Sequence, residues 1–394
     1  MSVTAEDTAP ALLAEPFWHR RLPTGTDVHV LSTGLVAVTG HAAVREALTH
    51  PAILAEHPLK ASARVLGPNV LDADGPRHRA FRTLLAPMLA AGRVAEYRAT
   101  LMPPLVESLA RRLAGTTTDD FYREYAHLVP YGIVCRLLGV GTGSAGTFHR
   151  LTRPLANLLD LPTQETPATH TQTAELLRLI EKHRTAAGAG DTSLLATIER
   201  TRDRKGISLT DDEVRATALL FFLAGTETSS AFITSLVYRL AHGTIDLGEL
   251  LDPTVREGFI DEVLRLHPPV QTVIRFATED VTVQGVRIPR HTAVLICLAA
   301  ANRDPRVFAH PDRLQFGRAE RGAVPFAAGA HACPGAALAK AEFSLLLEAL
   351  ARRCSRLVLL RDGQRTTSQS FAHPTDFTVE FQARAEFQAR REED

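Results

Sequence analysis

The sequence predicts a mainly α-helical fold with a minor β part. Between Ala42 and Leu350, apolar residues recur at steps of three and four, which is the spacing of helices that bury one face. Alternating apolar and polar residues, the pattern of half-buried strands, occur only in short patches. Helices should therefore form most of the body, with a small sheet part beside them.

The expected elements follow one another along the chain. Helical spacing is found at residues 44–48, 84–89, 105–113, 177–180, 194–198, 214–240 and 255–266. Strand-like alternation is found at residues 28–35, 281–288, 293–297, 357–360 and 377–381. The run Asp74-Gly75-Pro76 begins one of the helices, because proline at an early helical position loses no hydrogen bond.

Composition is that of an ordinary globular protein. The 394 residues are 45% hydrophobic and 22% charged, with zero formal net charge, so nothing attracts the chain as a whole to nucleic acid or to an anionic membrane. The longest apolar stretch, about residues 216–224, is too short to span a bilayer, so we expect no membrane partner and a cytoplasmic location. The four cysteines show no CxxC pairing, which favours reduced thiols.

The length alone would allow more than one domain. No linker, low-complexity tract or internal repeat divides the interior of the chain. We therefore expect residues 1–394 to form a single domain, with residues 1–15 as a flexible N-terminal segment.

Cys333 is the residue that says most about function. It lies in the run Phe326-Ala-Ala-Gly329-Ala-His331-Ala-Cys333-Pro-Gly335, directly before an apolar helical segment. A thiolate at a helix N-terminus is stabilised by backbone N–H groups and by the helix dipole, which suits a metal ligand. The alternative is a buried core cysteine, since free cysteine is among the most buried residue types. Gly329 and Gly335 favour the ligand hypothesis, because glycine lets the backbone approach a flat cofactor closely.

A second polar group lies inside an apolar helical segment, in the run Ala224-Gly225-Thr226-Glu227-Thr228. In a buried helix, a central glutamate and threonine must either form hydrogen bonds within the protein or take part in its function. Glycine weakens a helix, and a threonine can bond back to the carbonyl four residues earlier, so we expect a distorted helix at this point. The alternative is a solvent-facing Glu227 and a helix-capping Thr228.

Two further pairs have helical spacing. Glu262 and Arg265, three residues apart, share a helix face and can form an internal ion pair. His78 and Arg82, four residues apart, can place two donors on one carboxylate. The alternative for the second pair is a solvated basic helix face.

Together these motifs resemble those of the cytochrome P450 family, in the family's order and over about residues 16–381. The run ending at Gly335 is similar to the family's haem-binding signature, and Ala224 to Thr228 resembles the motif on the helix that crosses the distal haem face. Glu262 and Arg265 match the family's Glu-x-x-Arg. The resemblance implies the cytochrome P450 fold as a single haem-containing unit, with haem b (iron protoporphyrin IX) ligated through the Cys333 thiolate.

The resemblance also implies a role for each matched residue. Cys333 would ligate the iron, Thr228 would hydrogen-bond dioxygen and Glu227 would relay protons as the catalytic pair. Glu262 and Arg265 would be structural. The expected cofactor-binding residues besides Cys333 are His78, Arg82, Arg275 and His331 for the haem propionates, and Ala224, Phe326 and Gly335. The expected substrate pocket comprises Leu71, Phe222, Leu223, Val270, Val273 and Phe371.

Two positions in the ligand run depart from what is usual. Ala327 stands where the family usually has glycine, so we expect the turn there to be made without a positive φ. Pro334 follows the ligand directly and supplies no N–H to the sulfur.

The expected function is a haem-thiolate monooxygenase that inserts one atom of O2 into a hydrophobic small molecule, a bacterial secondary metabolite. Electrons are expected from a separate ferredoxin and ferredoxin reductase, docking on basic residues such as Arg79, Arg93, Lys340 and Arg353. A peroxide-driven enzyme is disfavoured by Glu227 and Thr228. A P450 that couples C–C bonds or desaturates stays open, as does a non-catalytic haem-binding redox or gas-sensor protein.

Overall fold

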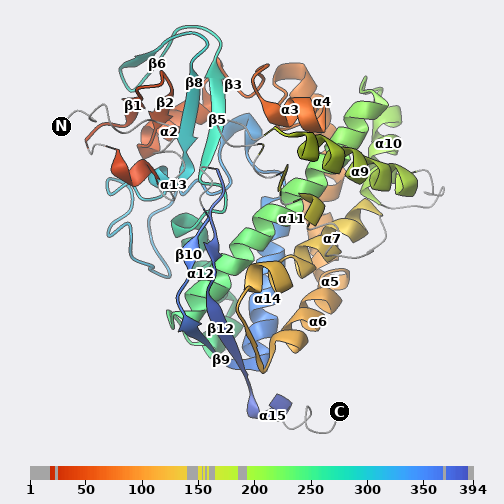
Figure 1. The fold of residues 1–394 in the computed structure, drawn as a ribbon, viewed down its shortest axis with the longest axis vertical. Helices are drawn as coiled ribbons and strands as arrows, with labels where there is room; N and C mark the ends of the chain where they lie inside the picture. Colours follow the sequence, from red (N-terminus) through yellow and green to blue (C-terminus); the bar gives the residue numbers. More distant parts are fainter. Residues whose placement is uncertain are drawn as a thin grey trace.

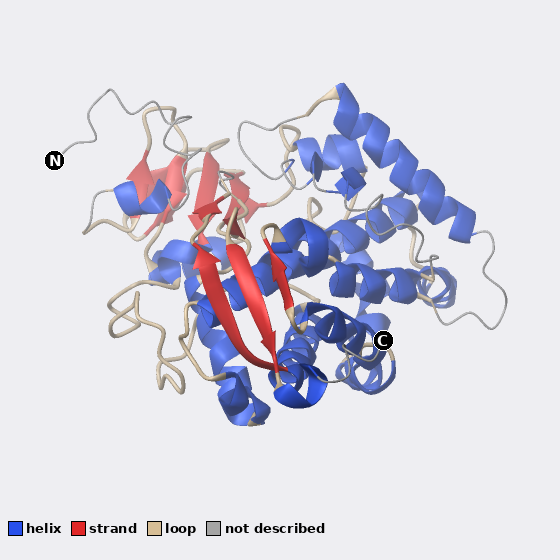
Figure 2. Cartoon of the chain, turned by 60° about the horizontal axis from the view of Figure 1, so that its bottom comes forward, coloured by secondary structure: helices blue, strands red, loops and turns tan. Residues whose placement is uncertain are grey.

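The fold is mainly helical with a minor β part, as the sequence predicts (Figure 1). The computed structural model describes residues 18–22, 25–139, 150–152, 154–155, 158, 165–184, 193–366 and 370–388. In Figure 2 the strands run from the upper left to the centre of the molecule, and helices make up most of the rest. The expected flexible segment at residues 1–15 lies outside the described residues.

Each of the seven predicted helical segments lies within a helix or coincides with most of one. The helices in chain order are η1 (Trp18–Arg21), α2 (His41–Thr49), α3 (Ala61–Leu66), α4 (Gly75–Leu89), α5 (Ala91–Thr100), α6 (Pro103–Leu113), η2 (Tyr122–Ala126), α7 (Leu128–Leu138), α9 (Pro167–Arg184), α10 (Leu194–Lys205), α11 (Asp211–Ala241), η4 (Leu247–Leu251), α12 (Pro253–Leu266), α13 (Leu298–Ala301), η5 (Gly329–His331), α14 (Ala336–Arg353) and α15 (Ala385–Gln388). The predicted start of α4 is confirmed, because Asp74 is its N-cap residue and Pro76 lies in its first turn.

The larger sheet has the strand order β1-β2-β8-β5-β3, and only its β2–β8 pair is parallel. Its strands are β1 (Val28–Val30), β2 (Val36–Val38), β8 (Ala293–Cys297), β5 (Thr272–Ala277) and β3 (Ile53–Leu54). A three-stranded sheet contains β4 (Thr116–Thr118), β12 (Thr378–Ala383) and β9 (Cys354–Arg361). Two antiparallel pairs complete the β part: β6 (Val281–Val283) with β7 (Val286–Ile288), and β10 (Gln364–Arg365) with β11 (Pro374–Thr375).

Helix α11 crosses the middle of the molecule (Figure 1). A capping box starts it, since Thr210 accepts from the Glu213 N–H and the Glu213 side chain accepts from the Thr210 N–H. Among the described residues it is the one helix long and apolar enough to cross a membrane, but 78% of its apolar window is buried inside the protein, as in any core helix. The helix is continuous through Gly225 and Thr228, so the expected break in its hydrogen bonds is absent, although the expected bond from Thr228 to the carbonyl four residues earlier is present.

Gly225 does not break the helix; it allows α7 to pack closely against α11. A Cβ atom at this position would lie 2.9 Å from Cγ2 of Val134 on α7. Real Cβ atoms do not approach other atoms so closely, so a side chain here would push the two helices apart. The glycine therefore lets α7 and α11 cross in close contact.

Glu262 and Arg265 form a buried ion pair behind the ligand loop. Nε of Arg265 donates to Oε2 of Glu262 over 2.8 Å, and Nη2 donates to Oε1 over 2.7 Å. Arg318 adds a third charge, with its Nε 3.0 Å from Glu262 Oε1. Nη1 of Arg265 donates to the carbonyls of Asn302 and Pro311, and Nη2 also donates to the carbonyl of Arg313. Because every charge has partners, the burial of these ions is compensated.

A buried carboxyl group, Glu342 on α14, faces α11. It is 3% exposed, and Ser229 on α11 is its hydrogen-bonding neighbour. Burial raises the pKa of Glu342 from its usual 4.5 to about 8, and the Ser229 hydroxyl acts weakly in the opposite direction. Glu342 is therefore neutral at pH 7, which lets a carboxyl group lie in an apolar core.

Removing Arg265 from the buried ion pair should be strongly destabilising. Arg265→Met leaves Glu262 and several carbonyl groups buried without a main donor, so we expect the free energy of unfolding to fall by about 3–5 kcal/mol. The matched control is Arg93→Met, which breaks the exposed Arg93–Glu96 pair of the same three-residue spacing and should change stability by less than about 1 kcal/mol. Urea unfolding measures both, and equal effects would contradict the structural role of the buried pair.

Glu342→Gln should stabilise the protein in a pH-dependent way. Because the folded pKa of Glu342 lies above the unfolded one, wild-type stability is retained below pH 4.5 and is lost as the pH rises toward about 8. The glutamine cannot ionise, so its advantage in unfolding free energy should grow from near zero at pH 4.5 to the order of a few kcal/mol at pH 8. A difference that stays constant over this range would show that Glu342 titrates normally.

Candidate active site

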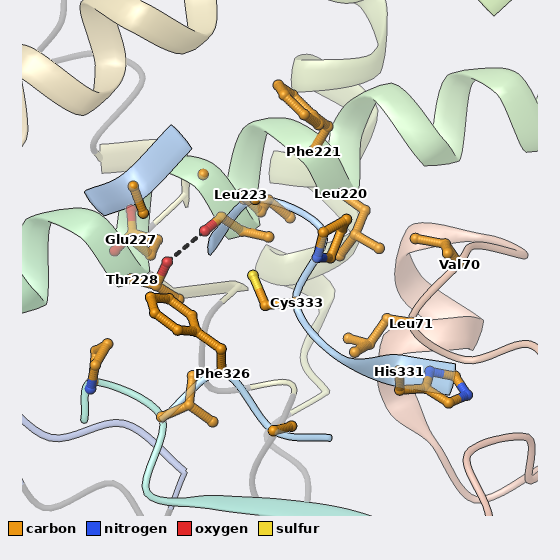
Figure 3. Close-up of a pocket in the computed structure, with 18 of the residues that line it drawn as sticks. Val70, Leu71, Leu220, Phe221, Leu223, Glu227, Thr228, Phe326, His331 and Cys333 are labelled. Atoms are coloured by element: carbon orange, nitrogen blue, oxygen red, sulfur yellow. Dashed lines mark hydrogen bonds between the residues drawn. The ribbon is translucent and has the colours of Figure 1, made fainter. Parts of the chain in front are cut away.

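A cavity of about 350 Å³ lies between α11, α14 and the loop that precedes α14 (Figure 3). Apolar side chains form most of its lining. Cys333 and Thr228 also line it, the first from the loop and the second from α11. The two sequence motifs thus meet at one cavity, although they are about 100 residues apart.

The loop that carries Cys333 is closed by its own backbone. The Cys333 N–H donates to the Phe326 carbonyl over 2.9 Å. Gly329 has φ +74°, and a Cβ there would lie 2.9 Å from the Leu48 carbonyl oxygen, so glycine is required. Ala327 has φ +58°, and the expectation of a turn without positive φ is therefore wrong. The closed loop imposes the left-handed conformation on an alanine, at a cost of about 1–2 kcal/mol.

The sulfur of Cys333 is exposed to the cavity and lies at the N-terminus of α14. Burial raises the pKa of its thiol, while the N–H groups of Gly335 and Ala336 and the Arg82 guanidinium act in the opposite direction. Pro334 takes no part, as expected, because it has no N–H. The sulfur therefore has donors for a negative charge although protein surrounds it, and the core-cysteine alternative does not describe it.

Gly335 leaves room on the cavity side of the sulfur. Its φ of −88° is open to any residue, and the nearest atom to a Cβ placed there would be the Cys333 sulfur at 3.9 Å. No other described protein atom within 4 Å excludes a side chain, so the backbone conformation and packing do not explain the glycine. A flat group lying against the loop would do so.

Four of the predicted residues place nitrogen donors around the same cavity. They are His78 and Arg82 on α4, Arg275 on β5 and His331 on η5. The His78 and His331 rings lie 4.2 Å apart. Burial, followed by the nearby His331 and Arg82, lowers the pKa of His78 to about 4. An anion in the cavity would stabilise the Arg82 and Arg275 guanidinium groups, and the uncharged His78 ring could donate one N–H to it.

Arg275 is the cavity residue that most clearly lacks an anionic partner among the described residues. It is 6% exposed, and its one hydrogen bond to a described residue runs from Nη1 to the Ile274 carbonyl over 2.9 Å. Burial lowers the pKa of its guanidinium, and the charges of Asp74 and Asp72 oppose this. A guanidinium has five N–H donors, so Arg275 has capacity for a carboxylate.

Sequence reasoning did not find the acidic partners of this cluster. His331 Nε2 lies 2.9 Å from Asp74 Oδ1, and Asp74 Oδ2 accepts the N–H groups of Ala55 and Glu56. Lys60 also lines the cavity and pairs with Asp72 over 2.6 Å. Lys60 belongs to no motif. The one sequence feature that distinguishes it is that the chain has only four lysines.

On α11, Thr228 and Glu227 have different surroundings. The Thr228 hydroxyl donates to the Ala224 carbonyl over 2.6 Å, the bond drawn in Figure 3. Glu227 is 6% exposed, and its carboxyl oxygens accept from the Tyr122 hydroxyl at 3.0 Å and the Thr152 hydroxyl at 2.5 Å. A solvent-facing Glu227 and a capping Thr228 are both excluded. Tyr122 and Thr152 carried no sequence signal, because they lie 105 and 75 residues from Glu227.

Most of the predicted pocket residues line the cavity, and one does not. Phe222 is 2% exposed and packs edge-on against Tyr131 of α7, with 5.9 Å between ring centroids. The prediction for Phe222 is wrong, because the helical period turns it toward α7 while Leu220 and Phe221 reach the cavity. The predicted residues that do line the cavity are Leu71, Leu223, Val270, Val273 and Phe371, together with Ala224, Phe326 and Gly335.

Known proteins with similar sequences share one family. A family model described as Cytochrome P450 matches residues 162–243 and 254–378. The 6-deoxyerythronolide B hydroxylase of Saccharopolyspora erythraea is 33% identical over 74% of this chain and 72% of its own. The vitamin D(3) 25-hydroxylase of Pseudonocardia autotrophica is 34% identical over 77% of both chains. The monooxygenase PikC of Streptomyces venezuelae is 31% identical over 89% of this chain and 84% of its own.

Solved structures agree with the sequence relatives. Ligand-free CYP164A2 of Mycobacterium smegmatis superposes with a TM-score of 0.78 at 26% identity, covering 88% of this chain and 90% of its own. CYP109Q5 of Chondromyces apiculatus shares the fold with a TM-score of 0.81, at 24% identity and over 95% and 97% of the two chains. The family match covers more than half of the chain, and the relatives are named hydroxylases and monooxygenases. The chain is therefore a member of the cytochrome P450 family and an oxidoreductase of the P450 monooxygenase class.

Proposed function

We propose that this P450 binds haem b through the Cys333 thiolate and inserts one atom of O2 into a hydrophobic small molecule. The observation that carries the proposal is the position of the Cys333 sulfur. It lies at the N-terminus of α14 and faces a cavity whose opposite wall, on α11, carries Thr228. Thiolate-ligated haem is the cofactor of the family, and its iron supplies the activation of O2 and the transfer of one oxygen atom when it is bound.

The residues around the cavity fit a haem. Gly335 leaves space beside the sulfur, since a Cβ atom there would meet only the Cys333 sulfur, at 3.9 Å. His78, Arg82, Arg275 and His331 would hold the two propionates, and the buried Arg275 guanidinium has the greatest need of such a partner. Ala224 on α11 and Phe326 on the loop also line the cavity. These assignments follow from the chemistry of the donor set.

Thr228 and Glu227 would manage protons on the α11 side. The Thr228 hydroxyl donates to the Ala224 carbonyl, and its oxygen can still accept a hydrogen bond from a group in the cavity. That arrangement would hold a proton donor at a fixed point. Glu227 also reaches the cavity and would carry protons from the protein interior toward Thr228.

The substrate would be bulky and apolar. Leu71, Leu223, Val270, Val273 and Phe371 supply an apolar wall from four different segments. Relatives named for a macrolide precursor and for vitamin D(3) favour a hydrophobic natural product, and we propose a bacterial secondary metabolite. Coupling or desaturation of such a molecule would appear as a product without added oxygen.

A ferredoxin with its reductase is proposed as the electron source. The expected basic docking patch is largely neutralised, however. Lys340 pairs with Asp261 at 2.5 Å, Arg353 with Glu107 at 2.8 Å and Arg93 with Glu96 at 2.5 Å. We therefore propose a docking surface of mixed charge, and association that depends only weakly on salt.

Cys333→Ser should abolish thiolate ligation. We expect the wild-type ferrous protein to give the red-shifted Soret band of a thiolate-ligated carbon monoxide complex, and the variant to lose it. Cys297→Ser is the matched control, since Cys297 is buried in β8 and is not among the residues that line the cavity. A wild-type spectrum typical of histidine ligation would refute the proposal.

Thr228→Ala should uncouple oxygen consumption from product formation. The variant should bind haem and carbon monoxide normally, yet the product formed per O2 consumed should fall roughly tenfold, with peroxide released instead. Vitamin D3 serves as the trial substrate, with mass spectrometry of the product and a surrogate ferredoxin. Unchanged coupling in the variant would favour the non-catalytic alternative, which has no use for Thr228.

A further inference from the structure

The carboxyl group of Glu227 is held by two hydroxyl groups that lie outside every motif of the sequence. Tyr122 donates to Oε2 over 3.0 Å and Thr152 donates to Oε1 over 2.5 Å. All three residues are buried. We propose that Tyr122 and Thr152 are positioning residues that set the place of the Glu227 carboxyl and so govern proton delivery to the cavity. This inference rests on the proposed function of Glu227.

The two donors come from separate parts of the fold. Tyr122 lies in η2, which packs against α11, and Thr152 follows Tyr122 by 30 residues. Each carboxyl oxygen is bound from a different element, so the group cannot turn about its last bond without breaking a hydrogen bond. The position of Glu227 is thereby fixed by two distant segments instead of by α11 alone.

The Tyr122 ring is itself fixed. It stacks on the His373 ring with 3.9 Å between centroids and 15° between planes. His373 Nδ1 lies 2.9 Å from the Pro374 carbonyl oxygen, which orients the imidazole. Phe371, two residues before His373, lines the cavity. The hydroxyl that holds Glu227 is therefore anchored to the segment that forms part of the proposed substrate wall.

The chemistry of the two bonds suits a group that loses a proton and regains it. A hydroxyl can donate to a carboxylate, and it can accept from a protonated carboxyl group by rotating its O–H bond. When Glu227 has given its proton to an acceptor in the cavity, both hydroxyls stabilise the carboxylate that remains. A proton from water then restores the acid. Tyr122 and Thr152 can therefore hydrogen-bond both the protonated and the ionised form of the Glu227 carboxyl group.

The test compares Tyr122→Phe with Tyr125→Phe. Both changes remove one phenol hydroxyl from the same short segment, but the Tyr125 ring faces Phe121 and Arg112. We expect Tyr122→Phe to keep the carbon monoxide spectrum while the product per O2 consumed, with vitamin D3 as probe, falls several-fold. Tyr125→Phe should behave as wild type. Equal coupling in both variants would overturn the inference.

A readout independent of turnover addresses the position of Glu227 itself. With ¹³C-labelled glutamate, the infrared difference spectrum between the ferric protein and its Glu227→Gln variant reports the carboxyl stretch of Glu227. We expect this band to shift in Tyr122→Phe and to stay in Tyr125→Phe, because carboxyl stretching depends on the hydrogen bonds accepted. An unmoved band in Tyr122→Phe would show that the hydroxyl does not hold the carboxyl.

Thr152 provides a second, separable arm. Thr152→Val removes the other hydroxyl at nearly equal volume, and Thr152→Ser keeps it. Valine should lower the coupling and shift the band, and serine should restore both; identical behaviour of the two variants would contradict the inference even if Tyr122→Phe fails to fold. Loss of the thiolate spectrum in the wild type would instead refute the proposed function, so the two failures are distinguishable.

Discussion

The proposed function depends on the loop that holds the Cys333 sulfur at the N-terminus of α14. Burial alone would keep the Cys333 thiol protonated, and the N–H groups of Gly335 and Ala336 with the Arg82 guanidinium oppose it. Those N–H groups point at the sulfur only because α14 begins directly after the loop. The loop in turn closes through the bond from Cys333 to Phe326, which demands left-handed backbone at Ala327 and Gly329. An alanine in that conformation indicates that loop geometry takes precedence over local preference.

Buried ionisable groups elsewhere in the described residues are accommodated in different ways. Glu262, Arg265 and Arg318 satisfy one another behind the loop, so they stabilise the core without serving chemistry. Glu342 avoids the problem by staying neutral. Around the cavity, Arg275 is the exception, because its guanidinium is buried with little more than a carbonyl among its described partners. Arg275 differs in this respect from Glu262, Arg265 and Arg318, which is why we propose that a ligand carboxylate binds it.

The sequence allowed prediction of what depends on local order. Helical period placed the helices, and short alternation located strands such as β8, whose bounds were predicted without error. It did not find β5, whose run Thr272–Ala277 is buried at all but one position and therefore lacks alternation. The motif residues around Cys333 reached one cavity as expected, whereas Phe222 failed because an apolar helix gives no sign of which side faces a pocket. Tyr122 and Thr152 could not be predicted, since contacts across such sequence distances leave no spacing to read.

Helical geometry explains why two neighbouring residues on α11 can divide one task. Successive side chains on a helix point about 100° apart, so Thr228 and Glu227 cannot face the same neighbours. Both residues line the cavity, but the Thr228 hydroxyl donates to the Ala224 carbonyl, whereas the Glu227 carboxyl accepts from the hydroxyls of Tyr122 and Thr152. In the proposed function, Thr228 would contact the reacting molecules and Glu227 would receive protons from the protein interior. If the proposed function holds, the pair would depend on this difference in contacts, and the bond between Glu227 and Tyr122 of η2 would matter as much as the place of Thr228 at the cavity.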